Sequence, residues 1–105
     1  MRRISTLFAL LFLLGTHLAF AQGKIAGRVT DSGNGEGLIG VNVVIDGTTQ
    51  GTTTDVDGNY IILNVRPGDY ALRFSYIGFS TKVISGIRVS TNQTTRYDLE
   101  LSEEI

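Results

Sequence analysis

Short apolar runs that alternate with turn residues constrain the fold of this chain more than any other feature. Residues 47–79 read GTTQGTTTDVDGNYIILNVRPGDYALRFSYIGF, and apolar side chains recur there at every second position within each run. This period of two is typical of strands with one buried face. Tight turns are predicted at 55–59, where Gly58 can take positive φ, and at 67–69, where Pro67 presets its own φ. The sequence therefore predicts an all-β domain.

The same period predicts seven short strands, which is typical of a two-sheet sandwich. We expect the strand at 70–76 to be central, the threonine-rich segment 50–54 to be an edge strand, and Ser85-Gly86 to break the sixth strand. Val65 is out of phase with the residues before it, which predicts a β-bulge at Leu63-Asn64. The residues expected to face the core are Ile25, Gly27, Val29, Val41, Val43, Ile45, Tyr60, Ile62, Val65, Tyr70, Leu72, Phe74, Tyr76, Thr95, Tyr97, Leu99 and Leu101.

The N-terminus has the three parts of a secretory signal peptide. Basic residues at 2–3 precede an apolar run at 7–14, and Ala19-Phe20-Ala21 forms a small-residue cleavage site. The competing interpretation is a membrane anchor, but the apolar run is well short of the roughly 20 residues that a bilayer crossing needs. We therefore expect residues 1–21 to be removed and the exported chain to begin at Gln22.

Loss of the signal peptide leaves a chain with few reactive side chains. Residues 22–105 contain no His, Cys, Met or Trp, and their seven basic and ten acidic residues give a net charge of −3. Such a surface does not favour nucleic acid as a partner. The lack of cysteine excludes a disulfide scaffold. The lack of histidine leaves no candidate general base beside a serine or threonine nucleophile. We therefore expect neither enzymatic activity nor a cofactor.

The turn at 55–59 is a weak calcium candidate, because Asp55, Asp57 and Asn59 place oxygen ligands at alternate positions. In a calcium loop, however, the glycine follows the third of these ligands, and a glutamate stands at the twelfth position. Here Gly58 comes too early, and Arg66 occupies the twelfth position. A plain hairpin turn is therefore the favoured interpretation.

Two kinds of binding surface remain open. An unpaired strand edge at Gln50, Thr52 and Thr54 would suit a protein partner of the cell envelope, because it can accept another strand. A glycan partner would instead need an exposed aromatic platform. The four tyrosines fall on the inward phase of their strands, so Phe79, at a strand end, is the candidate exposed aromatic residue.

Five segments resemble, in order, the carboxypeptidase regulatory-like domain family. They are 27–31 (GRVTD), 40–43 (GVNV), 51–60 (GTTTDVDGNY), 67–70 (PGDY) and 75–79 (SYIGF). The resemblance extends from Lys24 to about Leu101. It implies a transthyretin-like (prealbumin-like) Greek-key β-sandwich over residues 22–101, with 102–105 as an acidic tail or the start of a linker.

The resemblance also implies a place for the chain. This domain commonly follows the signal peptide of TonB-dependent outer-membrane receptors and precedes their plug and barrel. A non-enzymatic interaction or accessory module of the outer membrane or periplasm is therefore expected, either as the leading part of a receptor or freestanding. Membrane association would arise only through a receptor continuation. The alternative is a carbohydrate-binding or adhesion accessory domain of a secreted protein or hydrolase.

Overall fold

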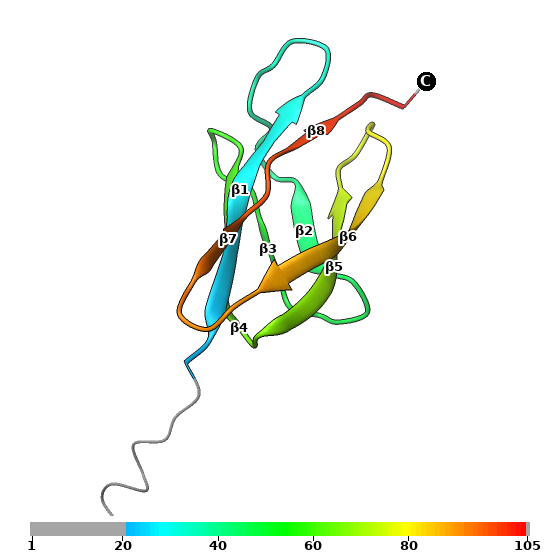
Figure 1. Cartoon of the computed structure of the whole chain (residues 1–105). Coiled ribbons are helices and arrows are strands. Elements are labelled where there is room, and N and C mark those ends of the chain that lie inside the picture. The colour runs from blue at the N-terminus through cyan, green and yellow to red at the C-terminus, as the bar shows by residue number, and fades with distance from the viewer. Residues whose placement is uncertain (1–20, 105) are drawn as a thin grey trace, which may run out of the picture.

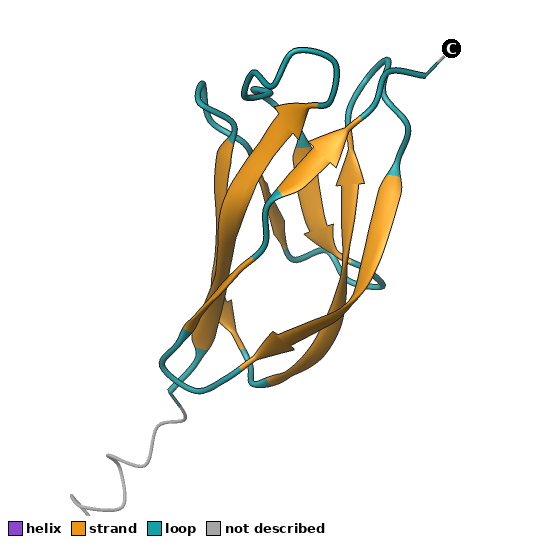
Figure 2. Cartoon of the chain, turned by 45° about the horizontal axis from the view of Figure 1, so that its top comes forward, coloured by secondary structure: helices purple, strands orange, loops and turns teal. Residues whose placement is uncertain are grey.

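The computed structural model describes residues 21–104, so the predicted signal peptide lies, except for Ala21, outside the described residues. Two β-sheets pack face to face (Figure 1), and Figure 2 shows strands joined by loops throughout the described part. The strands are β1 Gly23–Asp31, β2 Asn42–Ile45, β3 Gly51–Thr53, β4 Asn59–Val65, β5 Gly68–Ser75, β6 Lys82–Val89, β7 Thr94–Arg96 and β8 Leu99–Leu101. Within residues 21–104 no helix is long and apolar enough to cross a membrane.

The first sheet has the order β4-β1-β7, with β8 also paired to β1, and the second has the order β3-β2-β5-β6. β1 is antiparallel to β4 but parallel to both β7 and β8. The first and last parts of the domain are therefore neighbours in one sheet. The predicted all-β sandwich is confirmed, with β5 in the interior of the second sheet and β3 at its edge.

The buried core follows the predicted alternation along the strands. Phe74 and Leu72 of β5 are fully buried, as are Ile25 and Val29 of β1 in the opposite sheet. Every residue expected to face inward is buried or half-buried. Because the domain has no cysteine, packing of the two inner faces holds the sheets together without any disulfide.

The predicted last strand is divided into β7 and β8, which makes eight strands rather than seven. Between them the amide N of Tyr97 donates to the Ala26 carbonyl at 2.9 Å. The next ladder position is taken by a side chain, because the amide N of Arg28 donates to Asp98 Oδ1 at 2.8 Å. A carboxylate thus replaces a backbone carbonyl and interrupts the strand without changing its inward and outward phase.

The two irregularities predicted in the strands are both β-bulges. In β4, Val65 pairs with Gly23 and Ile62 with Ile25, so Leu63 and Asn64 stand opposite a single residue, as predicted. In β6, the predicted break at Ser85-Gly86 is wrong, because the strand continues through a bulge there. Gly86 takes φ 77°, which lets the strand keep its pairing with β5 on both sides.

The C-terminal residues run along the turn between β5 and β6 instead of leaving the domain. The amide N of Ser80 donates to the Ser102 carbonyl at 3.0 Å, and the amide N of Glu104 donates to the Gly78 carbonyl at 2.9 Å. Residues 102–104 are thus part of the paired body. The start of β1 and this tail lie at opposite ends of the sandwich (Figure 1).

Candidate docking edge

The hydrogen bonds of β3 determine which of its backbone groups face the open edge. The amide N of Ile45 donates to the Gln50 carbonyl at 2.9 Å, and the amide N of Thr54 donates to the Val41 carbonyl at 3.0 Å. Antiparallel ladders alternate, so Thr52, opposite Val43, also turns its backbone groups toward β2. Gln50, Thr52 and Thr54 therefore direct their backbone groups into the sheet.

Gly51 and Thr53 have the opposite phase. They stand opposite Val44 and Asn42 in non-hydrogen-bonded pairs, so their N–H and C=O groups turn away from β2. Both residues are exposed. A partner strand on this edge would consequently meet Gly51 and Thr53.

Thr54 does not belong to the open edge at all. Only 4% of it is exposed, and its Oγ1 donates to the Leu38 carbonyl at 2.5 Å while accepting from the amide N of Val41 at 2.9 Å. The prediction that Thr54 belongs to a partner-binding edge is wrong, because its hydroxyl joins the end of β3 to the loop before β2. A threonine-rich pattern gives no sign of this use.

Gln50 connects the edges of the two sheets. Its Nε2 donates to the carbonyls of Leu63 at 3.0 Å and Asn64 at 3.1 Å, both in the bulge of β4. The side chain therefore covers carbonyl groups that would otherwise be free at the edge of β4. Gln50 is a cap for β4 and not a free contact for a partner.

The calcium candidate forms a closed hairpin turn. Asp55 Oδ1 accepts from the amide N of Asp57 at 3.0 Å and from that of Asn59 at 2.9 Å. Gly58 takes φ 85°, and a Cβ on it would lie 2.4 Å from the Val29 carbonyl oxygen. Across residues 21–104, no three or more His, Cys, Asp or Glu side chains gather in a way that could hold a metal ion. The oxygen that a cation would need already serves the turn.

The aromatic side chains fill the interior of the sandwich. Tyr60 is 4% exposed, packs edge-on against Phe74 and donates its hydroxyl to the Tyr97 carbonyl at 2.5 Å. Burial, aided by the negative charge of Asp98, raises the pKa of Tyr60 above its ordinary value. Phe79 is half-buried against Tyr76, with ring centroids 5.4 Å apart, and packs on the core. The expected exposed platform at Phe79 is therefore wrong.

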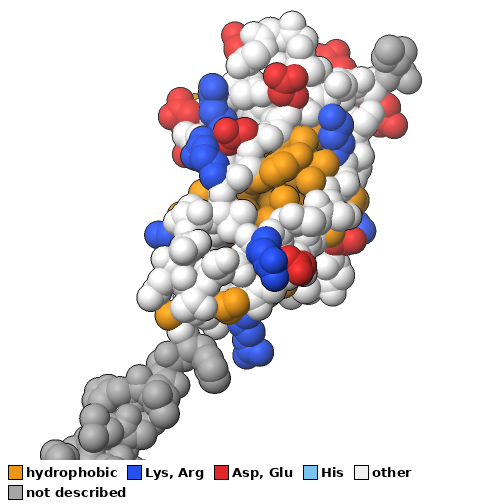
Figure 3. Space-filling model, viewed as in Figure 1, with side chains coloured by type: hydrophobic (Ala, Val, Ile, Leu, Met, Phe, Trp, Pro, Cys, Tyr) orange, Lys and Arg blue, Asp and Glu red, His pale blue; other side chains and the backbone are white. Residues whose placement is uncertain are grey.

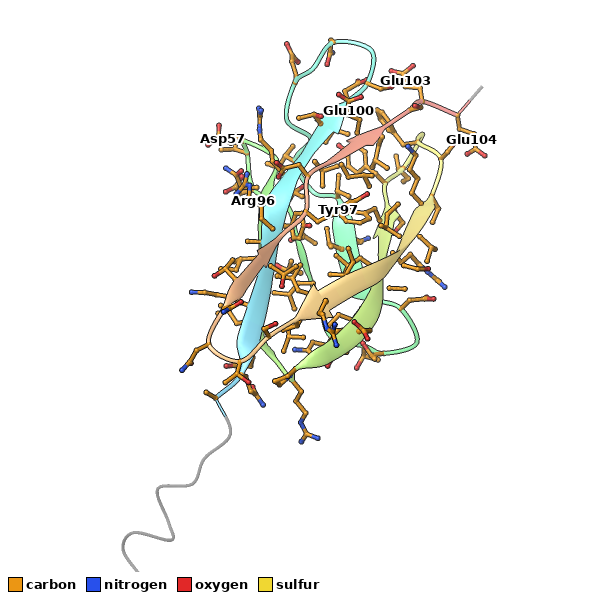
Figure 4. All side chains as sticks on the ribbon, in the orientation of Figure 1. Asp57, Arg96, Tyr97, Glu100, Glu103 and Glu104 are labelled. Atoms are coloured by element: carbon orange, nitrogen blue, oxygen red, sulfur yellow. The ribbon has the colours of Figure 1, made fainter. Side chains whose placement is uncertain are left out.

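An apolar patch that the alternation did not predict lies between β6 and the β7–β8 pair (Figure 3). Figure 4, in the same orientation, labels Tyr97 at this position. Hydrogen bonds cross the opening at two places: Lys82 Nζ donates to the Glu100 carbonyl at 3.1 Å, and Thr95 Oγ1 donates to the Arg88 carbonyl at 2.6 Å. The patch is thus an opening onto the core whose two sides are tied together.

These features define a small β-sandwich module with an open edge segment at Gly51 and Thr53. Residues 25–105 match the model of the CarboxypepD_reg-like domain family. The chain belongs to this family, and its domain is of the type that stands at the N-terminus of TonB-dependent receptors.

Two relatives show the relation to receptors. The chain is 38% identical to TonB-dependent receptor P3 of Formosa agariphila, over 96% of this chain and 10% of the receptor. It is 36% identical to TonB-dependent receptor SusC of Bacteroides thetaiotaomicron, over 83% of this chain and 8% of that receptor. The chain thus spans about a tenth of the length of these curated relatives.

Solved structures share the fold at low sequence identity. One is a cohesin–X-dockerin complex of Acetivibrio cellulolyticus, with TM-score 0.65 and 18% identity over 77% of this chain and 58% of that one. Another is a putative carbohydrate-binding protein of Bacteroides uniformis, with TM-score 0.58 and 24% identity over 77% of this chain and 41% of that one. At such identity the likeness shows the fold alone.

Proposed function

We propose that this chain is a non-enzymatic, exported docking module and forms the N-terminal extension of a TonB-dependent receptor in the outer membrane. One observation carries the proposal: nearly the whole chain matches receptors that are about ten times longer. A segment of this size can fold as one sandwich, but it is a small part of such a receptor. Its contribution is therefore to hold another molecule rather than to form the transport path.

The chemistry of the described residues supports docking over catalysis. The exported sequence has no His or Cys, and several carboxylates already have structural partners. Asp55 holds the hairpin turn, Asp98 completes the first sheet, and Asp46 Oδ1 lies 2.6 Å from Arg73 Nη2. General acid–base work would need such groups free in a cleft beside a nucleophile.

A protein partner fits the surface better than a glycan. The open segment of β3 offers backbone hydrogen-bonding groups at Gly51 and Thr53, which is what strand addition uses. A sugar platform would need a flat aromatic face in solvent, whereas Tyr60 is buried and Phe79 packs on Tyr76. A protein of the cell envelope is therefore the proposed partner.

Two measurements test this proposal. The gene is sequenced beyond the codon for Ile105, and cells that make the full-length product are fractionated. The expected continuation encodes a plug and a barrel, and the product is expected in the outer-membrane fraction. A continuation into a catalytic domain, with the product in the culture medium, would contradict the proposal. It would favour the accessory domain of a secreted hydrolase instead.

A further inference from the structure

Side chains cover backbone carbonyls at several strand edges of this sandwich. Natural sheets cover their edges because unpaired N–H and C=O groups recruit other strands. Three edge strands have such protection. The protecting contacts are Gln50 Nε2 on the Leu63 and Asn64 carbonyls of β4, Thr95 Oγ1 on the Arg88 carbonyl of β6, and Lys82 Nζ on the Glu100 carbonyl of β8.

Comparable protection is lacking along β3. Among the described residues, the outward backbone groups of Gly51 and Thr53 have one weak hydrogen-bonding contact. Thr52 Oγ1 lies 3.5 Å from the Thr53 carbonyl oxygen, which is the outer limit of a hydrogen bond. Proline and charged side chains are the usual means of preventing strand pairing at an edge. Residues 47–54 contain neither. The β3 edge is therefore open to a partner strand.

An open groove runs beside this edge, between β3 and β4. Its lining includes Thr52, Thr53 and Asp55 on the β3 side, residues 59–61 of β4 on the other, and Ala26, Gly27 and Arg96 from the neighbouring strands. Ile61 is 46% exposed and stands opposite Ala26. The bond from the amide N of Val29 to the Gly58 carbonyl sets the alternation of this pair of strands, so the backbone groups of Ile61 also turn outward. A segment in the groove meets backbone partners on β3 and apolar contact on β4.

Gly51 determines which side chain of a partner segment fits best on the face of β3 that Val44 shares. A Cβ on Gly51 would lie 2.5 Å from the Val43 carbonyl oxygen and 2.9 Å from Val44 Cγ2. The Val44 side chain therefore lies against the bare backbone of Gly51. A bulky apolar residue opposite an edge glycine covers that glycine and reaches its neighbour, which here is Val44.

We propose that the groove between β3 and β4 receives an extended, uncharged polypeptide segment that pairs with Gly51 and Thr53 and places a bulky apolar side chain opposite Gly51. The inference rests on the docking function proposed above and specifies the partner's chemistry. The edge itself is neutral from Gly47 to Thr54, and the two charged residues that line the groove, Asp55 and Arg96, have opposite signs. The groove therefore has no excess charge to offset the hydration that a charged segment would lose there, which favours a neutral occupant.

A defined peptide tests the groove. The probe is a short, end-blocked peptide of alternating threonine and valine with one central phenylalanine, titrated into the isotope-labelled exported chain and followed by NMR. The amide resonances of Gly51 and Thr53 are expected to shift and their hydrogen exchange to slow. A peptide with alternate backbone amides methylated keeps the side chains but cannot pair, so it is expected not to bind.

Two substitutions at one position separate backbone pairing from side-chain contact. Thr53→Pro removes an N–H that faces the groove and makes no bond to β2, whereas Thr53→Val keeps it. Loss of strand pairing is expected to weaken peptide binding by about tenfold or more in Thr53→Pro, and by less than about twofold in Thr53→Val. Since the methylated peptide is tested on the unaltered protein, the result does not depend on the folding of either variant.

Any one of three binding results would overturn the inference. They are resonance shifts confined to β6 and β8, equal binding of the methylated peptide, and equal binding by the two Thr53 variants. Self-association of the exported chain that Thr53→Pro abolishes would assign the edge to a second copy and would also overturn it. If the peptide fails to bind but cells lose ligand uptake when residues 22–101 are deleted, the groove assignment falls and the docking function stands.

Discussion

Gly27, Tyr60 and Tyr97 meet where the last strand is interrupted. A Cβ on Gly27 would lie 1.8 Å from the Tyr97 carbonyl oxygen and 2.8 Å from the Tyr60 hydroxyl oxygen. The same carbonyl accepts the Tyr60 hydroxyl at 2.5 Å. Glycine thus lets the chain between β7 and β8 approach β1, and the tyrosine holds it there.

Gly27→Ala is expected to destabilise the domain by about 1–3 kcal/mol or more, because backbone atoms must move to admit the methyl group. Urea unfolding followed by circular dichroism measures the change. Gly33→Ala is the matched control, since the nearest atom to its Cβ is a side-chain oxygen of Asp31 at 3.2 Å. Equal stability of the two variants would show that the close approach at Gly27 does not constrain the fold.

Tyr60→Phe is expected to lower the free energy of unfolding by about 1–2 kcal/mol at neutral pH, because the Tyr97 carbonyl loses its hydrogen-bond partner. The substitution should also change the response to alkali. Burial, and to a smaller extent the negative charge of Asp98, raises the pKa of Tyr60 in the folded chain. The unfolded chain therefore releases the proton of the Tyr60 hydroxyl at about pH 10, while the folded chain retains it. The stabilisation is complete below about pH 10 and is lost as the pH rises further.

Unfolding free energies of the two proteins, measured from neutral to alkaline pH, test this. The difference between wild type and Tyr60→Phe is expected to shrink above about pH 10. A difference that stays constant or grows with pH would contradict the assigned cause.

At the scale of elements, the C-terminal tail acts as a short extra pairing segment. Truncation after Leu101 removes the bonds from Ser80 to Ser102 and from Glu104 to Gly78. Amide exchange at Ser80 is therefore expected to speed up by about tenfold or more, while amides of β1 and β4 keep their protection. Unchanged exchange at Ser80, measured by NMR, would mean that residues 102–104 are a free linker.

The alternation of side chains predicted which face of each strand is buried, and it located the bulge in β4 from the phase of Val65. It could not predict the division of the last strand, because the carboxylate that divides it bonds to Arg28, far away in the sequence. It also could not show that Gly51 and Thr53, rather than Gln50, Thr52 and Thr54, face the open edge. Alternation assigns side chains to faces, whereas the direction of the backbone groups depends on which strand becomes the neighbour.

At the scale of the whole molecule, the two ends of the domain point away from each other (Figure 1). Such a module can stand in series with a following domain while its side edges stay accessible. In this arrangement the β3 edge and its groove lie along the flank of the sandwich, and neither end of the described domain, residues 21–104, contributes to the lining of the groove. The geometry therefore suits a receptor extension that captures a partner from the side.

Deletion of residues 22–101 from the proposed receptor, followed by measurement of ligand uptake by cells that carry the shortened protein, tests the docking function most directly. We expect the barrel to reach the outer membrane in unchanged amount, as judged by fractionation, while uptake of the receptor's ligand falls by roughly tenfold or more through loss of a docked partner. Unchanged uptake with a normal amount of receptor would contradict the account.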